Sequence, residues 1–378
     1  MAVFHRTALA DDLARKLAEP SATSAAPSGL FLAAPRRTGK STFLREDLRP
    51  ALERQGALVI YADLWADRAA DPGEVIVNAV RTALQQQQGV VARLARVSGV
   101  EKVSIGGLAF SLDRVGLGKG VSLSTALAAL SDESRQLVVL IIDEAQHAIT
   151  SSTGSDALFA LKAARDELNS SAHHGLRIVA TGSNRDKLAM LRNGKDQAFF
   201  GAPLVSFPTL GKDYIEWFVG QLPYRAELDP ERVYEWFAAA AYRPEILGSA
   251  ADALHFDLQV QPGEYASRFE ELVHEQVTAG NQEALRVVHS LTPLQATVLR
   301  VLATAGSSYA PYEAATMALY AQVLAAIDPQ SSITPDTNNV NQALQALQDK
   351  GLVWRASRGV YALEEASLAD LMRQAGMI

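Results

Sequence analysis

Residues 29–44 read Gly-Leu-Phe-Leu-Ala-Ala-Pro-Arg-Arg-Thr-Gly-Lys-Ser-Thr-Phe-Leu, which predicts an apolar strand, a tight polar turn and the start of a helix. In such a turn the backbone N–H groups and the helix N-terminus carry partial positive charge that holds phosphate oxygens. Lys40 would reach the β- and γ-phosphates, and the Ser41 hydroxyl would bind Mg²⁺. The residues expected around the nucleotide are Ala34, Pro35, Arg36, Arg37, Thr38, Gly39, Lys40, Ser41 and Thr42.

This loop departs from the G-x-x-x-x-G-K-[ST] pattern at its first position, where Ala34 replaces glycine. Alanine has less backbone freedom than glycine, so the match to a phosphate-binding loop is imperfect. The alternative interpretation is a chance Gly-Lys-Ser in an ordinary loop.

The composition indicates a chain of two or three domains that buries sizeable cores, with 378 residues of which 48% are hydrophobic. Its 35 Lys and Arg against 42 Asp and Glu give a net charge of -7, which offers no general attraction to nucleic acid. The absence of cysteine excludes disulfides, thiolate zinc sites and cysteine catalysis. With neither a signal-peptide pattern nor an apolar run of about 18 residues, we expect a cytoplasmic protein that does not bind membranes.

A second motif begins with the apolar run at residues 137–142, Leu-Val-Val-Leu-Ile-Ile, which is typical of a strand inside a parallel sheet. Asp143 and Glu144 follow at its carboxyl end, where ligands bind in open α/β sheets. Asp143 is placed to hold Mg²⁺, directly or through water, and Glu144 to polarise a water that attacks the γ-phosphate. The alternative is an exposed acidic turn.

Another strand is predicted at residues 177–181 and is followed by Gly182-Ser183-Asn184. The side chain of Ser183 or Asn184 could sit between the phosphate and the attacking water. Alternatively, these residues only cap the next helix.

The strands at residues 29–33, 57–62, 137–142, 177–181 and 203–207 alternate with helical patterns, which predicts an α/β three-layer sandwich over residues 1–208. A β-hairpin with Gly106 and Gly107 at its turn is expected as an insertion at about 101–114. Its basic side chains most simply form a solvated face.

Residues 209–290 have a purely helical pattern with an aromatic cluster that we interpret as core. One helix begins at Arg243-Pro244, and an arginine at the start of a helical lid could reach a nucleotide phosphate. The alternative is an ordinary surface arginine.

Residues 291–378 predict three helices, at 292–304, 311–326 and 337–350, and then two short strands, the layout of a winged helix. In a DNA-binding example the third helix enters the major groove and the turn at Ser357 and Arg358 touches the backbone. The third helix is rich in amides that could bond to base edges. However, this part has five basic and seven acidic side chains, so double-stranded DNA and a protein partner both stay open.

Together these motifs resemble the prokaryotic "archaeal ATPase" group of P-loop proteins, relatives of the AAA+ and STAND NTPases. The resemblance rests on residues 35–41, 142–146 and 181–183, and on Arg243-Pro244 ahead of a winged helix. It implies a sheet in the order 5-1-4-3-2, a helical lid, and ATP or ADP with Mg²⁺. It also implies roles in binding phosphate and metal (Lys40, Ser41 and Asp143), in activating water (Glu144), as first sensor (Ser183 or Asn184) and as second sensor (Arg243).

One departure from this group concerns turnover. Relatives commonly carry an arginine after the glycine of residues 199–202, whereas this chain has Ala202. An arginine finger is worth roughly 10³ to 10⁵ in rate where it operates, so its loss favours a slow switch over a motor. Arg185 and Arg192 are nearby substitutes.

We therefore expect an ATPase that hydrolyses slowly and acts as a switch, with a winged helix that engages DNA or a protein partner. One alternative is a nucleotide-gated scaffold that does not hydrolyse ATP. Another is a DNA-loading factor like the replication initiators. Nucleotide-dependent assembly into a homo-oligomer is open in each case.

Overall fold

The computed structural model describes residues 2–67, 69–87, 110–111, 121–170, 173–192, 197–357 and 359–378. The chain forms two compact units. The N-terminal unit comprises His5–Ala34 and Lys40–Phe207. The C-terminal unit comprises Pro208–Ile378, together with the loop Pro35–Gly39 and the residues before His5.

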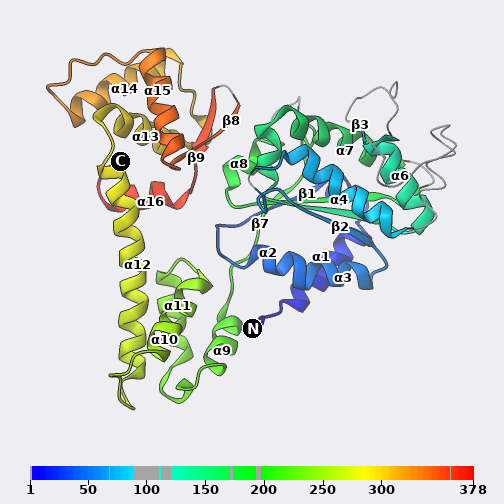
Figure 1. Cartoon of the computed structure of the whole chain (residues 1–378), viewed down its shortest axis with the longest axis horizontal. Coiled ribbons are helices and arrows are strands. Elements are labelled where there is room, and N and C mark those ends of the chain that lie inside the picture. Colours follow the sequence, from blue (N-terminus) through cyan, green and yellow to red (C-terminus); the bar gives the residue numbers. More distant parts are fainter. Residues whose placement is uncertain are drawn as a thin grey trace. The chain divides into compact units, whose positions relative to one another are not determined.

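The N-terminal unit contains a five-stranded parallel sheet with helices on both sides (Figure 1). The strand order is β2-β5-β6-β1-β7. Counted along the chain within this sheet, the order is the predicted 5-1-4-3-2 read from the opposite edge, so that prediction is confirmed. The strands are β1 (Leu30–Ala33), β2 (Leu58–Asp63), β5 (Val138–Asp143), β6 (Leu176–Gly182) and β7 (Leu204–Ser206).

Helices cover both faces of this sheet, as the apolar pattern of β5 requires. Leu140 and Ile142 face a core formed with α4, α6 and α7, whereas Val139 and Ile141 face a core formed with α1 and the helical segment after β1. These helices are α1 (Thr7–Ala18), α2 (Lys40–Thr42), which continues through the π-helical turn Phe43–Leu48 into α3 (Arg49–Arg54), α4 (Pro72–Gln86), α6 (Leu123–Ser134), α7 (Ser152–Ser170) and the short α8 (Arg185–Ala189).

The predicted hairpin at 101–114 lies outside the described residues, apart from β3 (Phe110–Ser111). This two-residue strand pairs in parallel with β4 (Val121–Ser122), just before α6.

The first part of the C-terminal unit is all helical, with α9 (Lys212–Gly220), α10 (Pro230–Ala239), α11 (Pro244–His255) and the long α12 (Tyr265–His289) (Figure 1). Trp236 and Phe237 of the predicted aromatic cluster lie in its buried core together with Tyr214 and Phe269. The other members of the predicted cluster are partly buried and pack against this core: Trp217, Phe218 and Tyr234.

A second core in this unit is formed by the last 90 residues or so, around Tyr320, Val340 and Leu344. Its elements are α13 (Pro293–Ala305), α14 (Ala314–Ile327), α15 (Thr337–Asp349), the antiparallel pair β8 (Val353–Ser357) and β9 (Val360–Leu363), and α16 (Ser367–Gln374). The three helices and two strands follow the order expected from the sequence. Arg358, predicted at the turn between the strands, lies outside the described residues.

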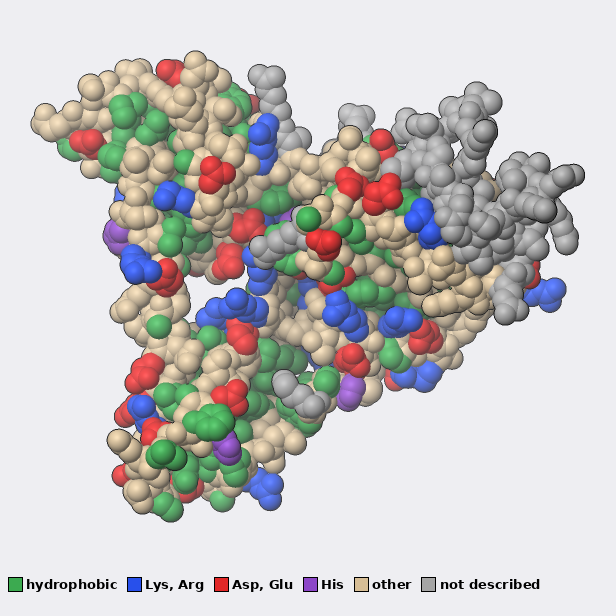
Figure 2. All heavy atoms as spheres, viewed as in Figure 1, with side chains coloured by type: hydrophobic (Ala, Val, Ile, Leu, Met, Phe, Trp, Pro, Cys, Tyr) green, Lys and Arg blue, Asp and Glu red, His purple; other side chains and the backbone are tan. Residues whose placement is uncertain are grey.

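Over the described residues, basic and acidic side chains are interspersed on the face of the molecule drawn in Figure 2. Among those same residues, every helix is too short or too polar to cross a lipid bilayer.

Candidate functional site

The loop after β1 turns sharply before the helix that carries Lys40. Arg37 and Gly39 have positive φ angles of 62° and 81°, and the Thr38 hydroxyl donates to the Pro35 carbonyl at 2.8 Å, which closes the turn. Ala34 needs no positive φ, and its backbone N–H donates to the carbonyl of Gly182 at 3.1 Å. The alanine that departs from the loop pattern therefore causes no backbone strain.

The two arginines of this loop form ion pairs within the C-terminal unit. Arg36 lies 2.6 Å from Glu364, and the more exposed Arg37 lies 3.9 Å from Glu245. Thr42, at the end of α2, is exposed.

Lys40 is buried between the two carboxylates that the sequence pairs with it. Its Nζ lies 2.8 Å from Glu144 Oε1 and 3.3 Å from Asp143 Oδ1, and the residue is only 5% exposed. Because β1 and β5 are parallel strands of one sheet, their carboxyl ends bring α2 and residues 143–144 to the same edge. The predicted convergence of Lys40, Asp143 and Glu144 is thus present.

Asp143 is 1% exposed and accepts hydrogen bonds at both carboxylate oxygens. Oδ2 accepts from the Ser41 hydroxyl at 2.6 Å and from the Tyr61 hydroxyl at 2.9 Å. Oδ1 accepts from the Thr181 hydroxyl and from the Glu144 backbone N–H. Burial alone would raise the pKa of Asp143, but the Lys40 ammonium and these hydroxyl donors outweigh it and hold the pKa below its ordinary value.

Glu144 is held by three side chains. Its Oε1 accepts from Lys40, and its Oε2 accepts from Gln146 at 2.6 Å and from Ser183 at 2.9 Å. Burial opposes ionisation, but Lys40 and the two hydrogen-bond donors to Oε2 lower the pKa of Glu144 overall. The backbone of Glu144 is left-handed (φ 54°, ψ 42°), a conformation that is unfavourable for residues other than glycine and that directs the chain out of β5.

The structure separates the two candidates for the first sensor. The Ser183 hydroxyl contacts the Glu144 carboxylate, whereas the Asn184 side chain accepts from the backbone N–H groups of Asp186 and Lys187 and caps α8. Asn184 therefore adopts the capping role that the sequence left open, and the Ser183 hydroxyl contacts the Glu144 carboxylate.

Each of the three predicted arginines donates to a backbone carbonyl or to a hydroxyl group. Arg243 is the N-cap residue of α11 in the C-terminal unit, where its Nε donates to the Ala240 carbonyl at 3.2 Å and lies 3.9 Å from Glu245. Arg185 donates to the Ser206 hydroxyl, and Arg192 donates to the Ala202 carbonyl. The roles of these arginines toward a phosphate stay predictions.

Three members of the site were not predicted from the sequence: Tyr61, Gln146 and Thr181. Thr181 could have been found, because it is the polar residue at the end of an apolar strand beside β5. Gln146 lies within the quoted motif but two residues beyond the carboxylates. Nothing in the local pattern of β2 distinguishes Tyr61 from an ordinary strand tyrosine.

The oxygen donors at this edge suit Mg²⁺. Ser41 and Asp143 offer a hydroxyl and a carboxylate within 2.6 Å of each other. Mg²⁺ prefers oxygen ligands and usually takes most of them from water and substrate phosphates. Over the part of the chain that the structure describes, no three His, Asp or Glu residues are grouped so that they could hold a metal by themselves.

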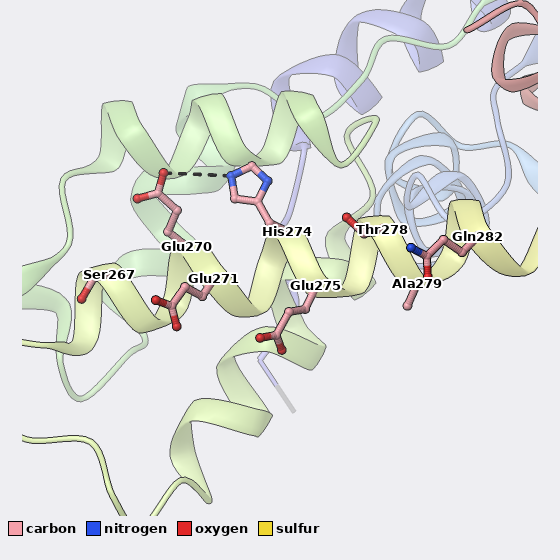
Figure 3. Close-up of a pocket in the computed structure, with 8 residues that line it drawn as sticks. All are labelled: Ser267, Glu270, Glu271, His274, Glu275, Thr278, Ala279 and Gln282. Atoms are coloured by element: carbon pink, nitrogen blue, oxygen red, sulfur yellow. Dashed lines mark ion pairs between the residues drawn. The ribbon is translucent and has the colours of Figure 1, made fainter. Parts of the chain in front are cut away.

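A separate shallow groove runs along one side of α12, lined by Glu270, Glu271, Glu275 and their neighbours on that helix (Figure 3). Its acidic groups are neutralised locally, because Arg232 pairs with Glu270 at 3.0 Å and Arg268 with Glu271 at 2.9 Å. Figure 3 also shows His274 of this groove facing Glu270, with 4.0 Å between His274 Nε2 and Glu270 Oε1.

No protein family model and no curated protein matches the sequence. Solved structures do match. The Walker-type ATPase PABY2304 of Pyrococcus abyssi is 18% identical, with 96% of this chain and 95% of that chain covered at a TM-score of 0.50. The ORC2 protein of Aeropyrum pernix, in its ADP form, is 16% identical, with 99% and 95% covered at a TM-score of 0.53. This chain has their fold.

Proposed function

We propose that the protein binds ATP with Mg²⁺ at the edge formed by β1, β5 and β6, and hydrolyses it slowly as a molecular switch. The observation that carries the proposal is the meeting of Lys40 and Ser41 with Asp143, Glu144 and Ser183. A cation, a metal-binding hydroxyl and two buried carboxylates are the parts that phosphoryl transfer to water requires.

Each side chain takes a role from its contacts. Lys40, now between two carboxylates, would exchange them for phosphate oxygens, and this exchange would release Glu144 to orient the attacking water. Ser183 would hold the Glu144 carboxylate in its orientation by donating a hydrogen bond to Oε2. Ser41 and Asp143 would hold Mg²⁺, which neutralises developing charge on the phosphates when it is bound.

Slow turnover is supported by the contacts of Arg185 and Arg192, the two arginines that could replace the missing arginine finger. Arg192 is engaged with the Ala202 carbonyl, and the position after Gly201 has no guanidinium. Without a finger, hydrolysis would lack a contribution of roughly 10³ to 10⁵ in rate. The same observation favours the second candidate, a nucleotide-gated scaffold that does not turn ATP over.

The output of the switch would come from residues 291–378, which we interpret as a winged helix. Exposed amides lie on α15 at Asn338, Asn341, Gln342 and Gln345, and the likeness to ORC2 extends over this part. The mixed charges argue against strong non-specific DNA binding. A DNA-loading factor and a protein-binding switch both fit this surface, as does assembly of several copies.

Steady-state ATP turnover by the purified chain, with and without duplex DNA, tests the proposal. Slow hydrolysis that requires Mg²⁺ is the expected result. ATP binding without any turnover would favour the nucleotide-gated scaffold over the hydrolysing switch. Failure to bind ATP would refute both proposals. Salt-dependent stimulation by DNA would favour the loading factor.

A further inference from the structure

Tyr61 lies on β2, one strand away from Asp143, and reaches it across the sheet. In the parallel register Tyr61 pairs with Ile141, two residues before Asp143 on the same face. The Tyr61 hydroxyl donates to Asp143 Oδ2 at 2.9 Å. This is the same oxygen that accepts from Ser41 at 2.6 Å.

The ring of Tyr61 is held in place from the helical side. The Arg45 guanidinium lies over it, 5.0 Å from the ring centroid, and forms an ion pair of 2.6 Å with Asp63 at the end of β2. Arg45 follows Ser41 by four residues, which is about one turn of the same helical segment. One segment therefore brings Ser41 to Asp143 and Arg45 to Tyr61.

These contacts decide how the Asp143 carboxylate is oriented. Oδ1 is fixed by Thr181 and by the backbone N–H of Glu144, so Oδ2 is the oxygen directed toward Ser41. A metal bound by both Ser41 and Asp143 would take over part of the Ser41 contact. Among the described residues, Tyr61 would then be the remaining donor to Oδ2, and its hydrogen bond would oppose rotation of the carboxylate away from the metal.

We propose that Tyr61 is a positioning residue, whose hydroxyl holds Asp143 in the orientation that binds nucleotide-associated Mg²⁺. This inference rests on the proposed function, because it assigns Tyr61 to the same metal site. The competing interpretation is that Tyr61 only fills space beside Ile141. Substitution by phenylalanine separates the two, since it keeps the ring and removes the hydroxyl.

The experiment titrates a fluorescent ATP analogue into the full chain, first with EDTA and then at increasing Mg²⁺. For Tyr61→Phe we expect metal-free binding within about twofold of wild type, and a half-saturating Mg²⁺ concentration about tenfold higher. In turnover, kcat at low Mg²⁺ should fall and recover at high Mg²⁺. Tyr224→Phe is the matched control, since it removes a buried hydroxyl of the C-terminal unit that makes no hydrogen bond to any residue the structure describes.

An unchanged Mg²⁺ dependence in Tyr61→Phe would overturn the inference while leaving the proposed function intact. If wild type itself fails to bind the analogue, the proposed function and this inference fall together. If Tyr61→Phe also loses metal-free binding, the Mg²⁺ dependence of Arg45→Met is measured in its place. Arg45 is exposed, and its replacement frees the Tyr61 ring without removing the Tyr61 hydroxyl. For Arg45→Met, a rise of about threefold in the half-saturating Mg²⁺ concentration supports the inference, and an unchanged concentration refutes it.

Discussion

The Nζ atom of Lys40 lies 2.8 Å from Oε1 of Glu144, although 104 positions separate the two residues in the chain. Both groups are largely buried, so each charge depends on the other for compensation. A triphosphate that binds Lys40 would compete with Glu144 for the ammonium. Under the proposed function, nucleotide binding would therefore be coupled through this one contact to the release of Glu144, the carboxylate proposed to activate water.

Replacing Glu144 by Gln should preserve ATP binding and lower turnover by about 10² to 10⁴, the usual contribution of a general base. Binding should become tighter, because the amide competes less well than a carboxylate for Lys40. Equilibrium binding and single-turnover hydrolysis measure the two effects. Glu46→Gln, which changes an exposed carboxylate in the same unit, is the control. A turnover rate equal to wild type would refute the assignment of Glu144.

The left-handed backbone at residue 144 gives a second expectation. Glu144→Gly and Glu144→Ala both remove the carboxylate, but only glycine adopts φ 54° without strain. Under conditions without nucleotide, the glycine variant should be more stable than the alanine variant by about 1 kcal/mol. Chemical denaturation of the two proteins side by side provides the comparison. Equal stability, or a more stable alanine variant, would show that the local backbone has relaxed.

Ser183 and Asn184 should respond differently to alanine. Asn184→Ala removes the N-cap of α8, so we expect a loss of about 1 kcal/mol in stability with little change in kcat. Ser183→Ala removes a donor to Glu144 Oε2, so we expect a lower kcat with stability nearly unchanged. The reverse pattern would assign the sensor to Asn184. Thermal unfolding and steady-state kinetics on both variants suffice.

The paired tyrosines of the last core should make the C-terminal unit sensitive to high pH. The Tyr309 and Tyr320 hydroxyl oxygens lie 2.5 Å apart, and burial raises the pKa of Tyr320 to about 12 and that of Tyr309 also above its ordinary 10.0. The stabilisation that comes from keeping these two hydroxyls protonated is complete below pH 10. It is lost as the pH rises through the pKa values of the two tyrosines in the folded protein. The expected decline is about 1.4 kcal/mol per pH unit for each tyrosine.

Unfolding monitored between pH 9 and 12, roughly the span between the unfolded and folded values, checks this behaviour. In the double variant Tyr309→Phe/Tyr320→Phe, the free energy of unfolding should fall less steeply with pH than in wild type. Some decline should remain, because other tyrosines with raised pKa values, such as Tyr224, are still present. Identical slopes would contradict the expectation.

The sheet order and the central cluster could be predicted because strong local patterns determine them. A continuous apolar run such as β5 is typical of the interior of a parallel sheet, and its carboxyl end then lies at the same edge as Lys40 at the start of α2. Asp143 and Glu144 were thereby placed beside Lys40 without any knowledge of tertiary contacts.

The rest of the site depended on side-chain directions that no local pattern specifies. Tyr61 reaches Asp143 only because the register aligns it with Ile141, and that register is a property of the assembled sheet. The choice between Ser183 and Asn184 was open for a similar reason, since either side chain can cap a helix. The wing and hairpin turns predicted at Arg358 and Gly106 lie outside the described residues.

The most direct test of the central claim is equilibrium binding of ATP with Mg²⁺ to wild type and to Lys40→Ala. Lys212→Ala, which removes an exposed lysine of the C-terminal unit, serves as the control. Losing charge-assisted bonds to phosphate should weaken binding by about a hundredfold in Lys40→Ala and leave the control unchanged. Equal affinity in wild type and Lys40→Ala, or no ATP binding by wild type, would contradict a triphosphate site between Lys40 and Asp143.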